Sequence, residues 1–469
     1  MNSKLKLPFT NFLKPIQNWI KIIQGKFWQV VSPMQGWRDS SWVLSDRLLG
    51  GLVIILIITL PFLENAQTGV IGVASAIALI MLWLTDQRDQ ATSSAWSPIF
   101  TPLLTYWCIS LLAAAFSPVK IAALDGLIKL TIYMLAFVAM HRLMGIGWRS
   151  LLVATYLVSC FVSSAYGVQQ WYLGAPELAT WTDPTSDSAG ITRVYSFLGN
   201  PNLFAGYLMP ALPLGVIAAI RWQSWGMKAL GILTAAMGVF SLTQTQSRGG
   251  LIGLVVTFFA LIILLVYWWG KRLPVWTLPA ALGSMAGVIA VATIAITPLR
   301  NRVFSIFGTA DSSNAFRVNV WLSVINMIKA RPLLGIGNGN KAFNLIYPLY
   351  QRSGYSALGA YSVPLELTVE TGIIGVICYG WLVVTILHQG WIALNQLRRD
   401  RHLDGLWIIA ALATICGMIA HSFFDTVWYR PQVQLLWWLA IALVSSLSAN
   451  LPYCSPTDFT TSQPPDSET

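Results

Sequence analysis

Apolar runs of about 17 to 25 residues follow one another along most of this chain, with short polar connections between them. A run of that length forms a helix that crosses the hydrocarbon core of a bilayer. The pattern therefore predicts an all-α polytopic membrane protein with about 12 transmembrane helices. The predicted spans are residues 48 to 63, 67 to 85, 98 to 116, 121 to 140, 151 to 171, 203 to 220, 229 to 243, 250 to 269, 275 to 297, 369 to 388, 405 to 424 and 432 to 448.

One long polar interval, residues 298 to 368, separates the ninth and tenth predicted spans. Asn314 is a suitable N-cap for a helix over residues 315 to 330, which the Arg331-Pro332 pair ends because a residue before proline disfavours helical backbone. Before Glu366 the interval carries one acid, Asp311, and many bases, namely Arg300, Arg302, Arg317, Lys329, Arg331, Lys341 and Arg352. We expect a large, cationic and partly helical loop.

Two features of this loop each allow two interpretations. Arg317 heads an apolar stripe with Trp321, and such an arginine either stacks on aromatic rings or binds an anion. The glycine-rich run 333 to 340 is typical either of a turn after a helix or of a phosphate-binding nest. No predicted strand precedes this run, although a nucleotide-binding fingerprint requires one.

The composition excludes an ordinary soluble protein, since 55% of the residues are hydrophobic and only 10% are charged. The formal net charge of +11 follows from the bias of membrane proteins toward basic cytoplasmic connections, so no nucleic-acid partner is expected. The five cysteines have no metal-like spacing. We therefore expect no metal ion and no cofactor. The first 46 residues lack the pattern of a signal peptide, so N-terminal cleavage is not expected.

Basic residues are unevenly distributed between alternate connections. The even-numbered connections contain ten of them, Arg88, Arg142, Arg149, Arg221, Lys228, Lys271, Arg272, Arg398, Arg399 and Arg401. The short odd-numbered connections contain four, Lys120, Arg193, Arg248 and Arg430. Cytoplasmic connections are the ones enriched in Lys and Arg. This distribution predicts an integral protein of the plasma (inner) membrane with both termini in the cytoplasm and the loop 298 to 368 outside it.

The two ends of the chain differ from the transmembrane domain at 48 to 448. Residues 1 to 47 interleave lysines with aromatic and aliphatic residues, which is typical of a basic amphipathic helix on an anionic cytoplasmic leaflet or of a partly disordered basic tail. Residues 449 to 469 are rich in Ser, Thr and Pro, which predicts a disordered cytoplasmic tail.

Charged residues beside the spans are candidates for a site. Arg248 lies in a tight turn at the outer membrane surface, where a lone charge is costly, so it either snorkels to lipid phosphate or shares an anion with the loop arginines. We expect Arg248 and Arg317 to share one anion site, with Arg193 and Arg331 as further anion-binding candidates.

Three pairs of polar residues lie one helical turn apart. Asp125 and Lys129 are expected to form an ion pair, with an ion pathway as the alternative. Glu366 and Glu370 lie at the mouth of the tenth span, where one of them could neutralise an arginine. His421 and Asp425 could form a hydrogen bond on a helix, either as a structural pair or as a proton relay.

Five short motifs occur in order along the second half of the chain. They are Asn200-Pro201-Asn202, Ser247-Arg248-Gly249, Arg317-x-x-x-Trp321, Arg331-Pro-Leu-Leu-Gly-Ile-Gly337, and Leu365-Glu366 followed by Glu370-Thr-Gly-Ile-Ile-Gly375. Together they resemble the O-antigen ligase and polymerase superfamily of membrane proteins over about residues 195 to 440. Within it, the strings 343 to 350 and 421 to 432 resemble the cyanobacterial IctB family, whose assigned role is bicarbonate transport.

The superfamily resemblance implies a site as well as a fold. In the glycan ligases, extracytoplasmic arginines hold the diphosphate of a polyprenyl-linked glycan, and Arg248 and Arg317 match the two arginine motifs. A histidine near the end of the long loop helps to activate the acceptor, but Tyr361 stands at that position here. With an ordinary pKa near ~10, a tyrosine is a poor general base at neutral pH.

These observations leave two main hypotheses, of which the first is favoured. The first is an IctB-like protein in inorganic carbon accumulation, with an arginine-lined extracytoplasmic site for bicarbonate and no enzymatic activity. The second is a ligase or polymerase that uses a polyprenyl-diphosphate glycan, supported by the arginines and opposed by Tyr361. A non-catalytic regulatory relative is a further alternative.

Overall fold

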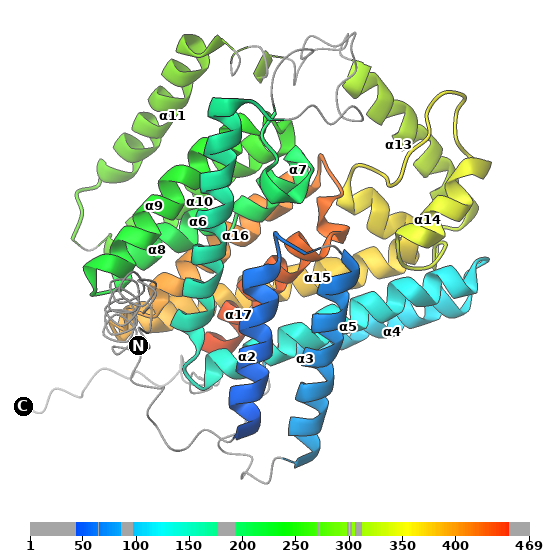
Figure 1. Ribbon diagram of the computed structural model, residues 1–469, viewed down its shortest axis with the longest axis horizontal. Coiled ribbons are helices and arrows are strands. Elements are labelled where there is room, and N and C mark those ends of the chain that lie inside the picture. The colour runs from blue at the N-terminus through cyan, green and yellow to red at the C-terminus, as the bar shows by residue number, and fades with distance from the viewer. Residues whose placement is uncertain are drawn as a thin grey trace, which may run out of the picture.

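The computed structural model describes residues 44–63, 65–85, 97–175, 193–270, 272–297, 300, 303–304 and 312–449. Every regular element within these residues is a helix, and nine of the helices there are long and apolar enough to cross a membrane. The prediction of an all-α polytopic membrane protein is confirmed (Figure 1). The described residues leave out Asp311, almost all of the predicted segment 1 to 47 and almost all of the tail 449 to 469.

The helices follow the predicted spans closely. They are α2 (Leu44–Thr59), α3 (Asn65–Thr85), α4 (Phe100–Ala115), α5 (Lys120–Gly145), α6 (Arg149–Leu173), α7 (Pro201–Leu208), α8 (Ala211–Arg221), α9 (Trp225–Gln244), α10 (Arg248–Trp269), α11 (Thr277–Ala295), α13 (Ser312–Ala330), α14 (Asn340–Ile346), α15 (Val363–Arg399), α16 (Gly405–Ser422) and α17 (Pro431–Ala449). Short 3-10 turns are η2 (Ser196–Leu198), η3 (Tyr347–Leu349) and η4 (Val427–Tyr429). The first three predicted spans coincide with α2, α3 and α4, and the other nine with the long apolar helices, counting α7 and α8 together.

The centre of the bundle is formed by α16 and α17, with α7 and α8 also largely buried (Figure 1). Trp407, Trp437 and Trp438 are among the largest fully buried side chains and all lie on α16 or α17. In contrast, α11 has no buried residue and lies at the edge of the molecule beside α10. A helix that is apolar throughout and unburied in the protein is suited to contact with lipid.

The tenth span is longer than predicted and is interrupted. Instead of residues 369 to 388 it covers Val363–Arg399, and Gly372 breaks it with φ 66° and ψ −173°. The break frees backbone groups that the glycine-rich loop then satisfies: Ile336 N–H donates to the Val369 carbonyl at 2.9 Å and Ile373 N–H to the Pro332 carbonyl at 2.8 Å. Irregular backbone inside a membrane protein is stable only with such partners.

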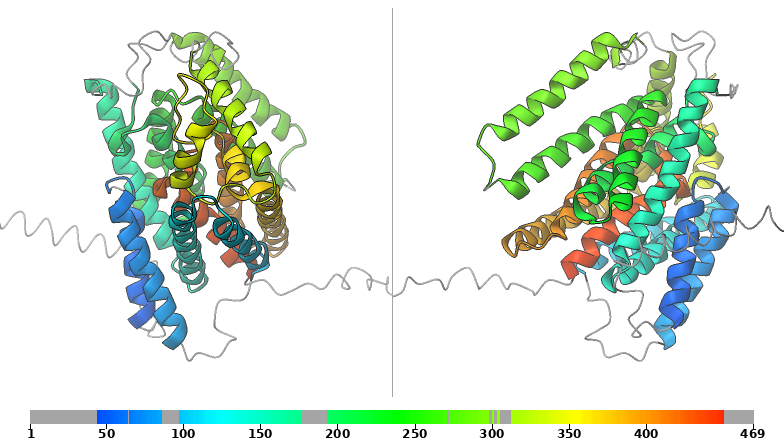
Figure 2. Two further views of the ribbon diagram at one scale, coloured as in Figure 1. Left: turned by 90° about the vertical axis from the view of Figure 1, so that its right-hand side faces the viewer. Right: turned by 60° about the vertical axis from the view of Figure 1, so that its left-hand side comes forward.

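The loop before the tenth span folds into a small unit on one end of the bundle (Figure 2). Its own core joins α13, α14 and η3 to the start of α15, and contains Val320, Val324, Met327, Ile336, Phe343, Tyr347, Ala360 and Val369. The predicted helix ends at Ala330 as expected but begins at Ser312. Asn314 therefore lies in its first turn and is not its N-cap.

The predicted ion pair on α5 is present. Lys129 Nζ lies 2.7 Å from Asp125 Oδ2, and Lys341 of α14 also contacts this carboxylate, at 2.9 Å from Oδ1. Asp125 thus links the folded loop to the bundle. All three side chains are partly exposed, so each pair stabilises this contact by no more than about 1 kcal/mol.

Candidate functional site: an arginine cluster beside an internal cavity

Arg248 is the first residue of α10 and is buried, with 7% of its surface exposed. The helix begins here because the Ser247 side chain accepts a hydrogen bond from Gly250 N–H at 3.2 Å, which is an N-cap. The Arg248 Nη1 donates to the Asn314 side-chain oxygen in the first turn of α13. The arginine therefore points toward the folded loop, and Asn314 is its partner.

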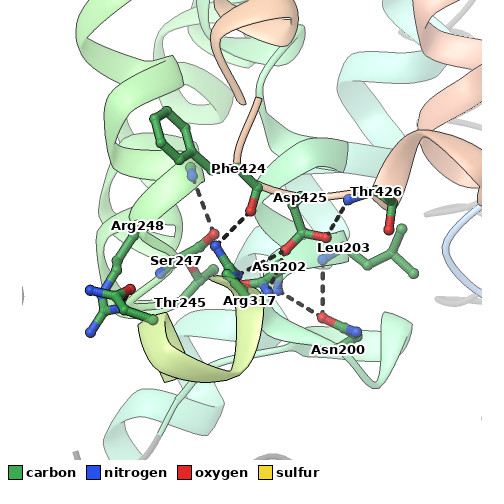
Figure 3. A network of polar contacts seen from close by, with 12 residues as sticks. Asn200, Asn202, Leu203, Thr245, Ser247, Arg248, Arg317, Phe424, Asp425 and Thr426 are labelled. Carbon is green, nitrogen blue, oxygen red and sulfur yellow. Dashed lines mark hydrogen bonds and ion pairs between the residues drawn. The ribbon is translucent and has the colours of Figure 1, made fainter. Parts of the chain in front are cut away.

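Arg317 follows Asn314 by three residues on the same helix. Its Nη1 donates to the Phe424 carbonyl at 2.7 Å, and its Nη2 lies 3.7 Å from Asp425 Oδ2 (Figure 3). Both partners belong to the turn after α16. Arg317 thus connects the folded loop to the bundle, and it lies one helical turn from the residue that Arg248 contacts.

Arg193 is the third cation of this site and precedes η2. Its Nε donates to the Thr245 carbonyl at 3.0 Å, and its Nη2 donates to Asn202 Oδ1 at 3.1 Å. The Asn202 amide in turn donates to Asp425 Oδ2 at 2.7 Å. One amide side chain therefore joins Arg193 to the carboxylate that Arg317 also contacts.

The three arginines lie close enough to influence one another's charge. Burial lowers the pKa of Arg193 to about 10; Asp425 opposes this shift, and Arg317 and Arg248 add to it. Arg193 is still protonated at neutral pH. We call Arg193, Arg248 and Arg317 the arginine cluster, and Asp425 is a carboxylate that acts on it, through Arg193 and through its contact with Arg317.

The motif Asn200-Pro201-Asn202 starts α7, as its sequence indicates. Asn200 Oδ1 accepts hydrogen bonds from Asn202 N–H at 2.8 Å and Leu203 N–H at 3.2 Å, and Pro201 occupies the first helical position. Capping fixes the backbone of Asn202, whose side chain is then directed at Asp425 (Figure 3). The motif therefore has a structural role and also positions a residue of the site.

A cavity of about 330 Å³, the larger cavity below, lies beside the cluster. Its polar lining includes Lys129, Asn200, Asn202, Asn340, Tyr361, Glu366, Asp425, Thr426, Tyr429 and Arg430, and its apolar lining comes mainly from α3, α5, α7 and α17. A smaller cavity of about 110 Å³ is lined by Glu370 among others, and Lys129, Tyr133, Asn340 and Tyr429 line both.

Tyr361 lines the larger cavity with an unusual backbone, φ 51°. Its ring lies 6.0 Å from the Arg317 guanidinium carbon and 5.8 Å from the Phe316 ring. Burial raises the pKa of the Tyr361 hydroxyl above its ordinary value of 10.0, and Asp425 adds to that shift while Arg317 opposes it. The hydroxyl is therefore neutral at physiological pH and unsuited to accept a proton.

The glycine-rich loop is not arranged as a phosphate nest. Gly335, Gly337 and Gly339 have φ of 66°, 93° and 98°, which suits glycine. However, the Gly339 N–H donates to Glu370 Oε1 at 2.7 Å and the Gly337 N–H to the Glu370 carbonyl at 2.9 Å. The donors of this loop therefore hold α15, so the loop is a structural turn.

The predicted hydrogen bond between His421 and Asp425 is wrong within the described residues. Helix α16 ends at Ser422, so Asp425 lies in the following turn and faces Asn202 and Arg317 instead. The His421 imidazole packs against α10, where a Cβ added to Gly249 would lie 2.8 Å from His421 Cδ2. Its Nε2 is buried and has no hydrogen-bond partner among the described residues.

The remaining predicted residues lie elsewhere. Arg331 donates to the Phe116 carbonyl at 3.2 Å and does not line either cavity, so the structure does not bring it to the cluster. Glu366 and Glu370 are 1% and 2% exposed and neither pairs with an arginine among the described residues. Asn202 was not predicted as a site residue, since the Asn-Pro-Asn motif gives only a helix-start signal.

Comparison with known proteins agrees with the motifs. A family model described as O-Antigen ligase matches residues 229–380. This stretch is similar to that family. It is less than half of the chain and includes Arg248, Arg317 and Tyr361, whereas Arg193, Asn202 and Asp425 lie outside it. No curated protein matches the chain. The match supports the superfamily resemblance, and the IctB resemblance stays a prediction.

Proposed function

We propose that the protein is a ligase-type glycosyltransferase of the plasma membrane that uses a glycan linked to a polyprenyl diphosphate. The arginine cluster binds the diphosphate on the extracytoplasmic side, and the larger cavity receives the sugar next to it. Similarity of residues 229–380 to O-antigen ligase supports this reaction class.

The observation that carries the proposal is the gathering of three arginines beside the larger cavity, where Arg317 contacts Asp425 and Asn202 joins Arg193 to the same carboxylate. They come from three separate connections between helices, and they are partly desolvated, since Arg248 is 7% exposed and the Arg317 side chain 18%. Charged groups in a partly desolvated site interact strongly with a ligand of opposite charge. A diphosphate carries several oxygens that guanidinium groups bind in pairs.

The size of the larger cavity favours a ligand bigger than a small anion. At about 330 Å³ it lies in the range of pockets for organic ligands, roughly 300 to 1,000 Å³. Its lining mixes amides, carboxylates and hydroxyls with apolar residues of α3, α5 and α17. Amides and carboxylates hydrogen-bond sugar hydroxyls, and an apolar wall suits the lipid end of the donor.

Bicarbonate is the second candidate ligand, because one of the two IctB-like strings lies at the site. Within residues 421 to 432, the larger cavity is lined by Asp425, Thr426, Val427, Tyr429, Arg430 and Pro431. The other string, 343 to 350, is mainly structural, since the buried rings of Phe343 and Tyr347 stack 5.1 Å apart. A family-specific ligand in this cavity would therefore contact only the first string.

Binding measurements on purified protein distinguish these ligands. We expect a short-chain polyprenyl diphosphate to bind, and Arg248→Ala or Arg317→Ala to weaken its affinity about tenfold to a hundredfold. That factor corresponds to loss of a charge-assisted hydrogen bond of about 1.5 to 3 kcal/mol. Isothermal titration calorimetry with the polyprenyl diphosphate and, separately, with bicarbonate gives both affinities.

Two other arginines serve as controls. Arg352 donates to Asn319 on the exposed part of the loop, and Arg331 contacts the Phe116 carbonyl. Replacing either with Ala should leave the affinity for the diphosphate within about twofold of the parent value. If the parent binds bicarbonate but not the diphosphate, and the cluster variants lose it, the ligand is the small anion. Unchanged binding of the diphosphate in both cluster variants would contradict the proposed site.

A further inference from the structure

Glu366 lies in the first turn of α15 and lines the larger cavity. It is 1% exposed, and its Oε2 accepts a hydrogen bond from the Ala360 N–H. Within the described part of the chain its side chain has no other hydrogen bond, and no basic nitrogen lies within 4.0 Å of its carboxylate. Its negative charge is therefore not neutralised by a neighbouring cation.

The other carboxylates near the cavity are held by cations or donors. Asp425 contacts Arg317 at 3.7 Å and accepts from Asn202 at 2.7 Å. Asp125 is paired with two lysines. A carboxylate stabilised by cations and donors accepts a proton less readily than one without them. Glu366 is thus the carboxylate of this cavity best suited to accept a proton.

The other titratable groups near the larger cavity do not compete for this role. The Tyr361 hydroxyl is neutral because burial raises its pKa. The His421 imidazole packs against Gly249 of α10 and lines a separate small cavity with Asp425, not the larger one. Tyr361, Tyr429 and Glu370 interact electrostatically with Glu366, and Lys129 and Arg430 line the same cavity.

Resting on the proposed function, we propose that Glu366 is the general base of glycan transfer, in place of the histidine that Tyr361 replaces. The acceptor hydroxyl oxygen attacks the anomeric carbon of the donor and forms the new glycosidic bond. The bond from that carbon to the diphosphate oxygen breaks, and its electron pair stays on the lipid diphosphate, which the arginine cluster holds. The hydroxyl proton passes to the Glu366 carboxylate and then to the released diphosphate or to solvent.

The chain offers a matched control one helical turn away. Glu370 is also buried, but it lines the smaller cavity and accepts hydrogen bonds from Gly339 N–H at 2.7 Å and Tyr429 hydroxyl at 3.0 Å. Glu370→Gln removes the same charge from the same helix and keeps an oxygen for Gly339. It should change the transfer rate by no more than about threefold.

The test is transfer of a labelled glycan from a polyprenyl diphosphate to a mixture of sugar and lipid acceptors. We expect Glu366→Gln to lower kcat about 10² to 10⁴-fold, the usual contribution of general-base catalysis, with unchanged affinity for polyprenyl diphosphate. In the Gln variant the fall in rate at acidic pH should also disappear, because the carboxylate that accepts the proton is absent. Glu366→Asp should restore part of the rate. Retained diphosphate binding shows that the Gln variant is folded.

The outcomes separate the two proposals. If parent and Glu366→Gln transfer glycan at the same rate and with the same pH profile, Glu366 is not the base while the proposed function stands. Equal losses in Glu366→Gln and Glu370→Gln, with the pH profile unchanged, assign both carboxyl groups a structural role. No transfer by a parent protein that binds the diphosphate overturns both proposals.

Discussion

The backbone of Tyr361 has φ 51°, a conformation that costs a non-glycine residue energy and that occurs often at functional sites. The tyrosine is held there by its ring, which lies against Phe316 and under the Arg317 guanidinium. Its hydroxyl has no hydrogen bond to a described residue. In the proposed reaction the ring therefore supports the arginine cluster, and the hydroxyl is not expected to take part in proton transfer.

This assignment predicts different results for two substitutions of Tyr361. Tyr361→Phe keeps the ring and should leave the transfer rate within about threefold of the parent rate. Tyr361→Ala removes the ring face beneath Arg317, a contact worth about 0.5 to 2 kcal/mol, so polyprenyl diphosphate should bind about twofold to thirtyfold more weakly. Transfer assays and calorimetry measure the two effects. A loss of more than about tenfold in the Phe variant would show that the hydroxyl takes part in the chemistry.

Sequence reasoning singled out the arginines that the structure brings together, but not the residues that join them. Arg248 and Arg317 stood out because a charge at the membrane surface or on an apolar stripe needs a partner. Asn202 has no such signal, because its hydrogen bond to Asp425 joins residues 223 positions apart. Arg331 belongs to a motif of the same resemblance, yet its partner is the Phe116 carbonyl. A sequence motif singles out a residue but does not show which partner its side chain contacts.

At the level of elements, the interrupted helix α15 fixes both the folded loop and Glu366. The loop residues 332 to 339 satisfy the backbone groups that Gly372 frees, and the Glu370 side chain closes the contact through Gly339. Many carriers also use broken helices, but there the freed backbone groups face a substrate or an ion. Here they are paired within the protein, which suits a rigid scaffold for the residues around Glu366.

Gly372 should therefore be intolerant of a side chain. A Cβ there would lie 2.1 Å from the Leu333 carbonyl oxygen, and the φ of 66° adds a cost of about 1 to 2 kcal/mol for any other residue. Gly372→Ala should lower the midpoint of thermal unfolding in detergent and weaken transfer. On the same helix, Gly380→Ala meets no atom within 4 Å and should be neutral or stabilising by up to ~1 kcal/mol. Equal midpoints of thermal unfolding for Gly372→Ala and Gly380→Ala would show that the backbone at the break adapts to a side chain.

The helices themselves could be predicted, since each predicted span coincides with one or two helices. Length and apolarity decide where a chain crosses a bilayer, and both are properties of the sequence alone. The break at Gly372 could not be predicted, because its hydrogen bonds come from a loop more than 30 residues away along the chain. The start of α13 was displaced for a related reason: Asn314 is used by Arg248 instead of capping its helix.

On the scale of the whole molecule, two groups of charged residues each join several connections within the described part of the chain. Arg149 and Arg221 both pair with Asp404, at 2.9 Å and 3.3 Å. These three residues belong to the fourth, sixth and tenth connections, which the sequence predicts on the cytoplasmic side. The arginine cluster and Asp425 instead join the fifth, seventh, ninth and eleventh connections. Each group therefore joins only even-numbered or only odd-numbered connections. A chain that crosses the membrane once between successive connections requires this arrangement.

The orientation of these two groups in the membrane is predicted from the distribution of basic residues and can be tested directly. The even-numbered connections are richer in Lys and Arg, so the Asp404 end should face the cytoplasm and the arginine cluster the outside. In a variant without the five native cysteines, Gln351→Cys lies on the exposed surface of the folded loop, and Asp400→Cys lies at the exposed end of α15. In intact spheroplasts, an impermeant thiol reagent should label the first variant, and it should label the second only after permeabilisation.

Labelling of Asp400→Cys in intact spheroplasts, with Gln351→Cys protected, would show that the orientation is the opposite one. The arginine cluster would then face the cytoplasm, where an extracytoplasmic lipid-linked glycan is out of reach, so that result would also remove the proposed reaction.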